Sequence, residues 1–309
     1  MSYCRVKMPV AGLANRLFPW ARCKLFSLQH RVRMLAPNWL QLKIGPTLRG
    51  ESDPRLYGGQ FRPAPGELWG LRKYAIIGAC QSVKEPGDSD QTLFENGTVV
   101  VFEGMKKYFD PLNEHVTLLR AELVKSVRPV WLEKVAALQL PPVGLHVRLG
   151  DFAVPKSADE LRTRGGVRTP MSWYVDSLRV IRRLSGGITP AFVVSDGGQS
   201  ELAELLAMPE VTLLRSGSAV GDLLALSKSK LIIATGGSSF SAWASFLGES
   251  PVVSVPGQSL AWFNLRRSGG PFVGEFDPDR PSPPALRAIA DAITPFEAHQ
   301  VKGETLWGG

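Results

Sequence analysis

Residues 143–151 read VGLHVRLGD, an apolar stretch that runs directly into an arginine, a glycine and an aspartate. A short apolar run without polar alternation is typical of a strand covered on both faces in a parallel sheet. Four similar runs follow, at residues 191–194, 211–214, 231–234 and 252–255. Segments with helical spacing of apolar residues separate them, so the second half predicts an α/β fold built of strand–helix units around a parallel sheet.

The first half of the chain alternates less regularly. Its expected elements are strands at 5–8, 32–35, 74–77 and 98–102 and helices at about 16–29 and 113–127. The stretch 43–72, rich in Gly, Pro and Arg, predicts long surface loops.

Length and a proline step favour a two-domain organisation. At 309 residues the chain exceeds one average domain. Leu140-Pro141-Pro142 directly precedes the strand at 143 and predicts an interdomain linker. The predicted division is an N-terminal α/β domain at 1–140, a C-terminal Rossmann-like domain at 141–285, and a helix and tail at 286–309.

Composition excludes several classes of protein. The three cysteines and four histidines are dispersed, so we expect no disulfide framework, no metal site and a reducing, cytoplasmic compartment. No signal peptide is recognisable, and no apolar run reaches the roughly 18 residues of a membrane span, which leaves at most peripheral membrane contact. The net charge of +8 fits either an anionic partner or a solvated basic surface. Since no nucleic-acid module is present, no nucleic-acid binding is expected.

The carboxyl end of the 143–147 strand carries the first candidate site. Strand alternation places His146 and Arg148 on one face, and ligands of open α/β sheets gather at this end. The planar guanidinium of Arg148 can bind two phosphate oxygens at once, and Gly150 leaves room beside it. A structural pairing of Arg148 with Asp151 would explain the same residues, so both interpretations stay open.

Further polar stretches follow other predicted strands. Ser195 and Asp196 end one run and Asp222 precedes a short helix, positions typical of helix capping as well as of ligand binding. A carboxylate at 222 would also match the two donors of a guanine edge. Residues 235–241 read TGGSSFS, and these glycines, hydroxyls and a helix start are typical of a phosphate cradle, without the Gly-Lys pair of a P-loop. A structural Gly-rich turn with serine caps is the alternative.

The first half contributes one candidate loop, Gly12-Leu13-Ala14-Asn15-Arg16, between a predicted strand and a predicted helix. Small residues let the backbone approach a ligand closely, and a helix N-terminus offers free N–H groups to an anion. A turn between strand and helix needs glycine in any case. This loop would face the other stretches across a cleft between two domains.

Taken in order, these stretches resemble the bacterial α-1,2-fucosyltransferases and, more distantly, the α-1,6- and protein O-fucosyltransferases. His146–Asp151 matches their His-x-Arg-x-Gly-Asp signature, and Gly12–Phe18 is similar to their Gly-Leu-Gly-Asn-Gln-Met-Phe opening. Further matches are Glu103–Phe109, Trp173-Tyr174, Phe192–Asp196, Asp222–Ser227, Ile232–Trp243, and Pro256 with Trp262–Asn264. The resemblance covers nearly all of the chain from Val10 to Asn264.

The resemblance implies a glycosyltransferase B-type (GT-B) fold, in which two Rossmann-like domains face a cleft and the N-terminal one lies on the acceptor side. It implies inverting transfer of fucose from GDP-fucose to a glycan or lipid-linked oligosaccharide, with no metal and no cofactor besides the GDP-sugar substrate. Arg148 would hold the β-phosphate, His146 a phosphate or ribose oxygen, and Asp222 the guanine. The other implied donor contacts are Gly12, Asn15, Arg16, Ser195, Asp196, Ser238, Ser239 and Phe240.

Some positions depart from the family pattern. Arg16 replaces the usual Gln, Gly236-Gly237 lengthens the loop before the serines, and Ala242 takes the place of a Trp. The same fold with another nucleotide sugar, or a non-catalytic nucleotide-sugar-binding protein, therefore stays an alternative. The sequence indicates neither acceptor nor linkage nor oligomeric state.

The sequence nominates no general base cleanly. Asp151 is the nearest carboxylate of the motif and is predicted to be catalytic together with Arg148. Asp159 and Glu160 lie in the following loop, where an acceptor could reach them.

Overall fold

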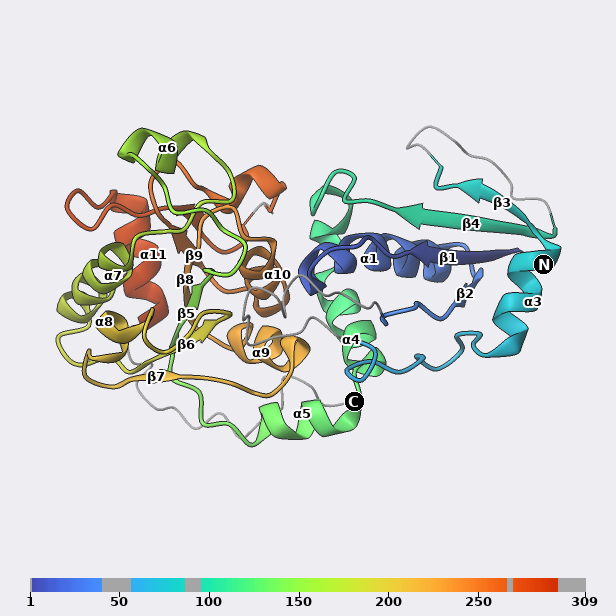
Figure 1. The fold of residues 1–309 in the computed structure, drawn as a ribbon, viewed down its shortest axis with the longest axis horizontal. Helices are drawn as coiled ribbons and strands as arrows, with labels where there is room; N and C mark the ends of the chain where they lie inside the picture. Colours follow the sequence, from blue (N-terminus) through green and yellow to red (C-terminus); the bar gives the residue numbers. More distant parts are fainter. Residues whose placement is uncertain (1, 41–56, 87–95, 266–268, 294–309) are drawn as a thin grey trace.

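The computed structural model describes residues 2–40, 57–86, 96–265 and 269–293, and it shows two α/β lobes lying side by side (Figure 1). The first lobe holds β1 to β4 and the second holds β5 to β10. Every pairing between these strands is parallel. The predicted α/β architecture with a parallel sheet in the second half is therefore confirmed.

The first lobe is built on a four-stranded sheet of order β2-β1-β4-β3 within the described residues. Its strands are β1 (Tyr3–Lys7), β2 (Arg33–Leu35), β3 (Gln81–Lys84) and β4 (Thr98–Glu103). Its helices are α1 (Leu13–Gln29), α3 (Leu71–Ala79), the 3₁₀ helix η1 (Asp110–His115) and α4 (Val116–Ser126). Of the loops predicted over 43–72, residues 43–56 lie outside the described residues.

The strand predicted at 74–77 is wrong, because these residues lie in the middle of α3. Ile76 and Ile77 pack with Cys80 against a small apolar cluster beside the sheet, so a helix already covers the apolar side chains of this run. The true strand, β3, is the polar sequence QSVK that follows. It is an edge strand, and an edge strand needs no apolar run to hold it in place.

The second lobe is built on a six-stranded sheet of order β10-β9-β8-β5-β6-β7 within the described residues. Its strands are β5 (Val143–Val147), β6 (Ala191–Ser195), β7 (Val211–Leu213), β8 (Leu231–Ala234), β9 (Val252–Ser254) and β10 (Val273–Glu275). Its helices are α5 (Pro129–Ala136), α6 (Ala158–Thr163), α7 (Met171–Leu184), α8 (Ala203–Leu206), α9 (Ala219–Leu226), α10 (Ser239–Gly248), the 3₁₀ helix η2 (Leu260–Phe263) and α11 (Pro283–Ile293). We assign α5 to this lobe because it packs against α9.

The strand order reverses at β5, which is the point where an open α/β sheet leaves a crevice for a ligand. The chain moves outward from β5 to β6 and β7 and then returns to β8 on the other side of β5. The register pairs Val147 with Ser195 and His146 with Ala234. The residues that follow these strands, Arg148, Asp196 and Thr235, consequently emerge together at one sheet edge.

An aromatic cluster joins the two lobes. Trp243 of α10 is fully buried, with its ring centroid 5.2 Å from that of Phe18 of α1 and 4.8 Å from that of Phe109. The same apolar core continues from the first lobe into the second without interruption. Arg120 of α4 adds an ion pair to Glu249 at 2.9 Å, so the lobes are held by packing and by charge.

Candidate active site

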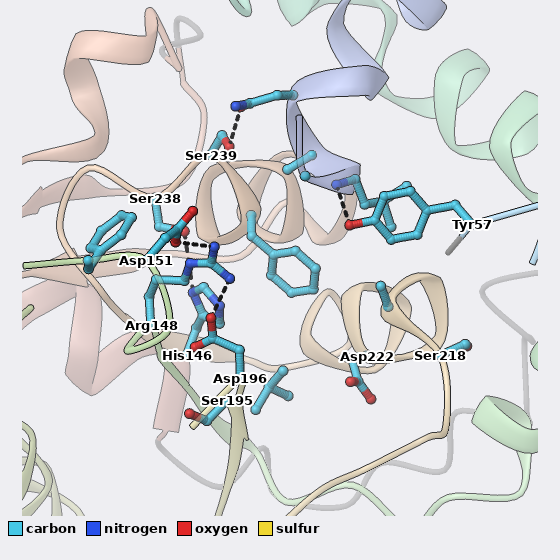
Figure 2. A pocket seen from close by; sticks show the side chains of 18 of the residues that line it. Tyr57, His146, Arg148, Asp151, Ser195, Asp196, Ser218, Asp222, Ser238 and Ser239 are labelled. Carbon is cyan, nitrogen blue, oxygen red and sulfur yellow. Dashed lines mark hydrogen bonds and ion pairs between the residues drawn. The ribbon is translucent and has the colours of Figure 1, made fainter. Parts of the chain in front are cut away.

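A cavity of about 550 Å³ lies between the lobes at the carboxyl ends of the second-lobe strands (Figure 2). The second lobe contributes the loops after β5, β6, β7, β8 and β9, and the first lobe contributes residues 12–15, Tyr57, Met105 and Tyr108, among others. All of the predicted donor contacts except Arg16 line this cavity, and so do both residues predicted to be catalytic, Arg148 and Asp151. Segments that are far apart in the sequence thus converge on one space.

Arg148 is held between two carboxylates. Its Nη1 lies 2.6 Å from Asp196 Oδ2, and its Nη2 donates a hydrogen bond to Asp151 Oδ1. Asp196 is fixed in turn by the backbone N–H groups of Leu149 and Gly150, which donate to its two oxygens at 2.8 and 3.2 Å. Arg148 is thus paired with Asp151 and also lines the cavity, so the pairing does not exclude contact with a ligand.

A buried hydroxyl network fixes the backbone on either side of Arg148. The Thr235 hydroxyl accepts the Arg148 N–H at 2.7 Å and donates to the His146 carbonyl oxygen at 2.8 Å. The hydroxyl of Tyr174, fully buried on α7, lies 2.7 Å from the same Thr235 oxygen, and burial raises the pKa of Tyr174. Each of these hydroxyl and backbone groups has a hydrogen-bond partner. The backbone of Arg148 is therefore held in place by the network, whatever its side chain binds.

His146 is buried beside the arginine as a neutral ring. Burial lowers the pKa of His146 to about 3, with Arg148 acting in the same direction and Asp196 opposing it. Its Nδ1 lies 2.7 Å from the Ser241 hydroxyl, and its ring stacks on Phe240 at a centroid distance of 4.9 Å. Ser241 can donate to Nδ1 when Nε2 carries the proton, and the ring is then an uncharged hydrogen-bond donor.

Two helices begin at the cavity, one from each lobe. Helix α10 has Ser238 as its N-cap and α1 has Gly12, and neither N-cap residue makes a side-chain capping hydrogen bond. At the edge of the cavity the Ser239 hydroxyl donates a hydrogen bond to Asn15 Oδ1 at 2.6 Å, and this bond joins the two helix starts directly. Helix N-termini carry partial positive charge and free N–H groups, so this arrangement suits an anion.

The glycine pair before α10 has a steric reason. A Cβ on Gly236 would lie 2.1 Å from the Cβ of Gln258, whose amide donates to the Leu161 and Arg164 carbonyl oxygens at 2.7 and 2.9 Å. Gly237 has a φ of +65°, a left-handed conformation that favours glycine. The longer loop is thus compatible with a cradle at the start of α10.

Asp222 lies apart from the Arg148 group, on α9 (Figure 2). The N-cap of α9 is Ser218, which accepts the Gly221 N–H at 3.0 Å, so the expectation that Asp222 starts or caps the helix is wrong. Asp222 Oδ1 instead accepts the Ser216 N–H at 2.8 Å, which closes the loop after β7, and Asp222 lines the cavity. Arg215 of the same loop lines the cavity as well.

Arg16 does not reach the cavity. Its side chain is fully buried and donates to the carbonyl oxygens of Ala11 and Trp39 at 3.1 and 2.7 Å, with its guanidinium 4.7 Å from the Tyr57 ring centroid. Burial lowers the pKa of Arg16. The placement corrects the expectation of direct donor contact, because the first turn of α1 directs this side chain into the first lobe.

Asp159 and Glu160, the alternative bases, do not line the cavity either. Ser157 caps α6 by accepting the Glu160 N–H at 3.1 Å, and the Glu160 carboxylate is paired with Arg164. Of the three carboxylates considered as a base, Asp151 is the one that lines the cavity.

Several lining residues were not predicted from the sequence. Tyr57 is almost fully buried, and its hydroxyl accepts the Leu13 N–H at 3.0 Å at the start of α1. No local pattern could have paired residues so far apart in the chain. Arg215 could have been found, because it comes two residues after the end of β7, close to where Asp196 stands after β6.

The described part of the chain shows neither a metal-binding cluster nor a membrane-spanning helix. No group of three or more His, Cys, Asp and Glu side chains is arranged to hold a metal ion in this part of the chain. Among the helices described, none is long and apolar enough to cross a membrane.

Comparison with known proteins bears on the fold. No protein-family model matches the chain, and no curated protein matches it in sequence. Among solved structures, the fucosyltransferase NodZ from Bradyrhizobium is similar, with a TM-score of 0.52 and 13% identity over 82% of this chain and 95% of that chain. NodZ alpha-1,6-fucosyltransferase co-crystallized with GDP gives a TM-score of 0.52 and 14% identity over 83% and 97% of the two chains. The chain therefore has the two-lobed GT-B fold found in these fucosyltransferases.

Proposed function

We propose that the protein is an inverting glycosyltransferase that moves a fucosyl group from GDP-fucose to a hydroxyl of a glycan or lipid-linked oligosaccharide. The observation that carries the proposal is the convergence of Arg148 and the starts of α1 and α10 on one cavity between the lobes. The signature His146–Asp151 supports the assignment, and so does the likeness in fold to a fucosyltransferase that was co-crystallized with GDP.

A diphosphate in this cavity would compete with the carboxylates that already surround Arg148, so one of them has to give up its ion pair with the arginine. The lining side chains include the guanidinium groups of Arg148 and Arg215 and the carboxylates of Asp151, Asp196 and Asp222. Asp196 is fixed by two backbone N–H groups, whereas the Asp151 side chain is 42% exposed. We therefore expect the diphosphate to replace Asp151 on Arg148, with the helix N-termini contributing about half a positive charge each.

The exchange gives Asp151 a role in the reaction. The bond between the sugar C1 and the diphosphate oxygen breaks, its electron pair stays on the diphosphate, and the acceptor oxygen bonds to C1 from the opposite face. The proton of the acceptor hydroxyl passes to the Asp151 carboxylate. Arg148 and the helix N-termini face the charge that grows on the leaving group, so they stabilise the transition state more than the ground state.

A panel of nucleotide sugars tests the proposal directly. Nucleotide release and thermal shift would be measured with GDP-, UDP- and TDP-sugars, with and without glycan acceptors. We expect GDP-fucose to give the largest release and the largest shift. Binding without any hydrolysis or transfer would instead point to a nucleotide-sugar-binding protein.

Base selection should depend on Asp222. In Asp222→Asn the amide oxygen can still accept the Ser216 N–H, so the β7–α9 loop keeps its hydrogen bond. The variant loses the second acceptor oxygen that a guanine edge would need, which costs about 1–3 kcal/mol when a donor is left unpaired. Calorimetry should show GDP affinity falling roughly tenfold, with weak UDP binding and the melting temperature unchanged.

Ser157→Ala is the matched control, because it removes a helix cap that lies outside the cavity. It should lower stability by about 1 kcal/mol and leave nucleotide affinity alone. Equal wild-type affinity for GDP, UDP and TDP would rule out base reading by Asp222.

We also propose that transfer needs no metal ion, since the guanidinium and the helix N-termini supply the positive charge that the leaving diphosphate requires. Transferase activity should then be unchanged in excess EDTA when nucleotide release is followed in a continuous assay. A loss of activity restored specifically by Mg²⁺ or Mn²⁺ would contradict this part of the proposal.

A further inference from the structure

The cavity has a second, aromatic end that the donor site does not use. Trp262 of η2 lines the cavity and is 52% exposed, an unusual state for so large an apolar side chain. It stacks on the buried ring of Phe263 at a centroid distance of 4.0 Å, and Tyr108 meets it edge-on at 5.2 Å. Met105 completes this end and is 37% exposed. We call Tyr108 and Trp262 the aromatic platform.

The platform is held by two turns, one from each lobe. Phe109 N–H donates to the Phe263 carbonyl oxygen at 3.1 Å, and Asn113 Nδ2 donates to the Asn264 carbonyl oxygen at 2.8 Å. These bonds fix the two aromatic side chains relative to each other although they lie far apart in the sequence.

The backbone beneath the platform is strained. Lys107 and Tyr108 are consecutive non-glycine residues with φ values of +54° and +47°, and Asn264 has a φ of +58°. Such conformations persist only where surrounding structure imposes them, and they cluster at functional sites. The left-handed pair lies where Tyr108 meets Trp262 of the other lobe on one side and Phe18 of its own lobe, at a centroid distance of 5.5 Å, on another.

The sheet order separates the platform from the nucleoside end. In the order β10-β9-β8-β5-β6-β7, Asp222 and Arg215 follow β7, Arg148 and the α10 cradle follow the central β5 and β8, and Trp262 follows β9. A nucleotide whose base lies near Asp222 and whose diphosphate lies at Arg148 leaves the β9 end of the cavity to another molecule.

From this arrangement we infer that the aromatic platform is the acceptor subsite and that it binds one pyranose ring of the acceptor by its apolar face; the inference rests on the proposed glycosyl transfer. The axial C–H groups of a β-galactoside or β-glucoside form a flat, weakly positive face that matches the π-face of an indole. Trp262 offers such a face at low entropic cost because its partners already fix it. Trp262 is therefore a specificity-determining residue for the acceptor, distinct from the donor contacts.

The test compares Trp262→Ala and Trp262→Phe with wild type. The acceptor probes are p-nitrophenyl β-glycosides of galactose, glucose, N-acetylglucosamine and mannose, with the nucleotide sugar that wild type turns over fastest. Truncating a Trp that anchors a ligand weakens binding by about tenfold or more, so the glycoside KM should rise by roughly that factor in Trp262→Ala and less in Trp262→Phe. Nucleotide affinity measured by calorimetry should stay the same.

Trp69→Ala is the matched control, because Trp69 is 68% exposed and lies outside the cavity lining. It should leave the glycoside KM unchanged. An unchanged glycoside KM in Trp262→Ala, or an equal loss of nucleotide affinity, would overturn the assignment. So would a wild type that binds GDP but no glycoside of the panel, whereas a wild type that binds no nucleotide would refute the proposed function instead.

Discussion

Replacing Arg148 with alanine should lower the rate of glycosyl transfer roughly 10²–10³-fold, the usual effect of removing one donor that stabilises developing negative charge. Arg148 stands at the cavity between Asp196 and Asp151, so its fork is already oriented before any ligand arrives. In the proposed reaction the loss should fall mainly on kcat, because charge on the diphosphate would grow as the glycosidic bond breaks. Steady-state kinetics with the preferred nucleotide sugar would measure it.

Arg148→Lys is the sharper variant. A lysine keeps the charge but cannot bind Asp196 and two phosphate oxygens at once, so it should recover little of the activity. Arg164→Ala, which removes an exposed arginine paired with Glu160 outside the cavity, serves as the control for losing a guanidinium. Near-normal turnover in Arg148→Lys, with an unchanged melting temperature, would remove Arg148 from the catalytic machinery.

Replacing Trp243 with alanine should lower the free energy of unfolding by about 3–5 kcal/mol, the range for deleting a large buried aromatic side chain. Trp243 is fully buried and contacts the rings of Phe18 and Phe109, so its removal opens a void between the lobes. Urea unfolding followed by circular dichroism would measure the change.

Two further variants serve as comparisons for the Trp243→Ala measurement. The Trp243 Nε1 is buried without a hydrogen-bond partner among the described residues, so Trp243→Phe removes an unsatisfied donor and should cost clearly less than alanine. Trp69→Ala, at an exposed position, should change stability by less than about 0.5 kcal/mol. A loss below about 1 kcal/mol in Trp243→Ala would mean that the lobes do not share this core in solution.

The second lobe could be predicted from the sequence because its sheet is buried on both faces. Strands such as β5 and β8 read as uninterrupted apolar runs, and helical spacing between such runs admits few topologies. The short strand β10, VGE, carries no such signal and was not predicted.

The first lobe was harder to predict, because here an apolar run forms a helix and a polar run forms an edge strand. The apolar residues 74–77 belong to α3, whereas the polar residues 81–84 form β3. Buried charge misleads in the same way. Lys24 is almost fully buried with Glu67 at 2.7 Å, a pairing that links distant parts of the chain and that no local pattern reveals.

Positions that directly follow a strand could be predicted as candidate site residues, since parallel topology brings strand ends together. Arg148 and Asp196 were found in this way, Ser238 was found in the glycine-rich stretch after β8, and all three line one cavity. The direction of a side chain was less predictable. Arg16 turns into the lobe because its partner is the distant carbonyl of Trp39. Asp222 lies beyond the Ser218 cap, which is a local contact that sequence reasoning overlooked.

The aromatic core shared by the lobes fixes the width of the cavity between them. Opening the cavity by swinging one lobe would expose the rings around Trp243 to water, so the spacing between the starts of α1 and α10 is set when the chain folds. The chain therefore completes the walls of the cavity before a ligand arrives, and the nucleotide that we propose as its ligand would meet an opening of fixed dimensions. Discrimination between ligands then rests on shape and charge at that opening, with no contribution from lobe closure.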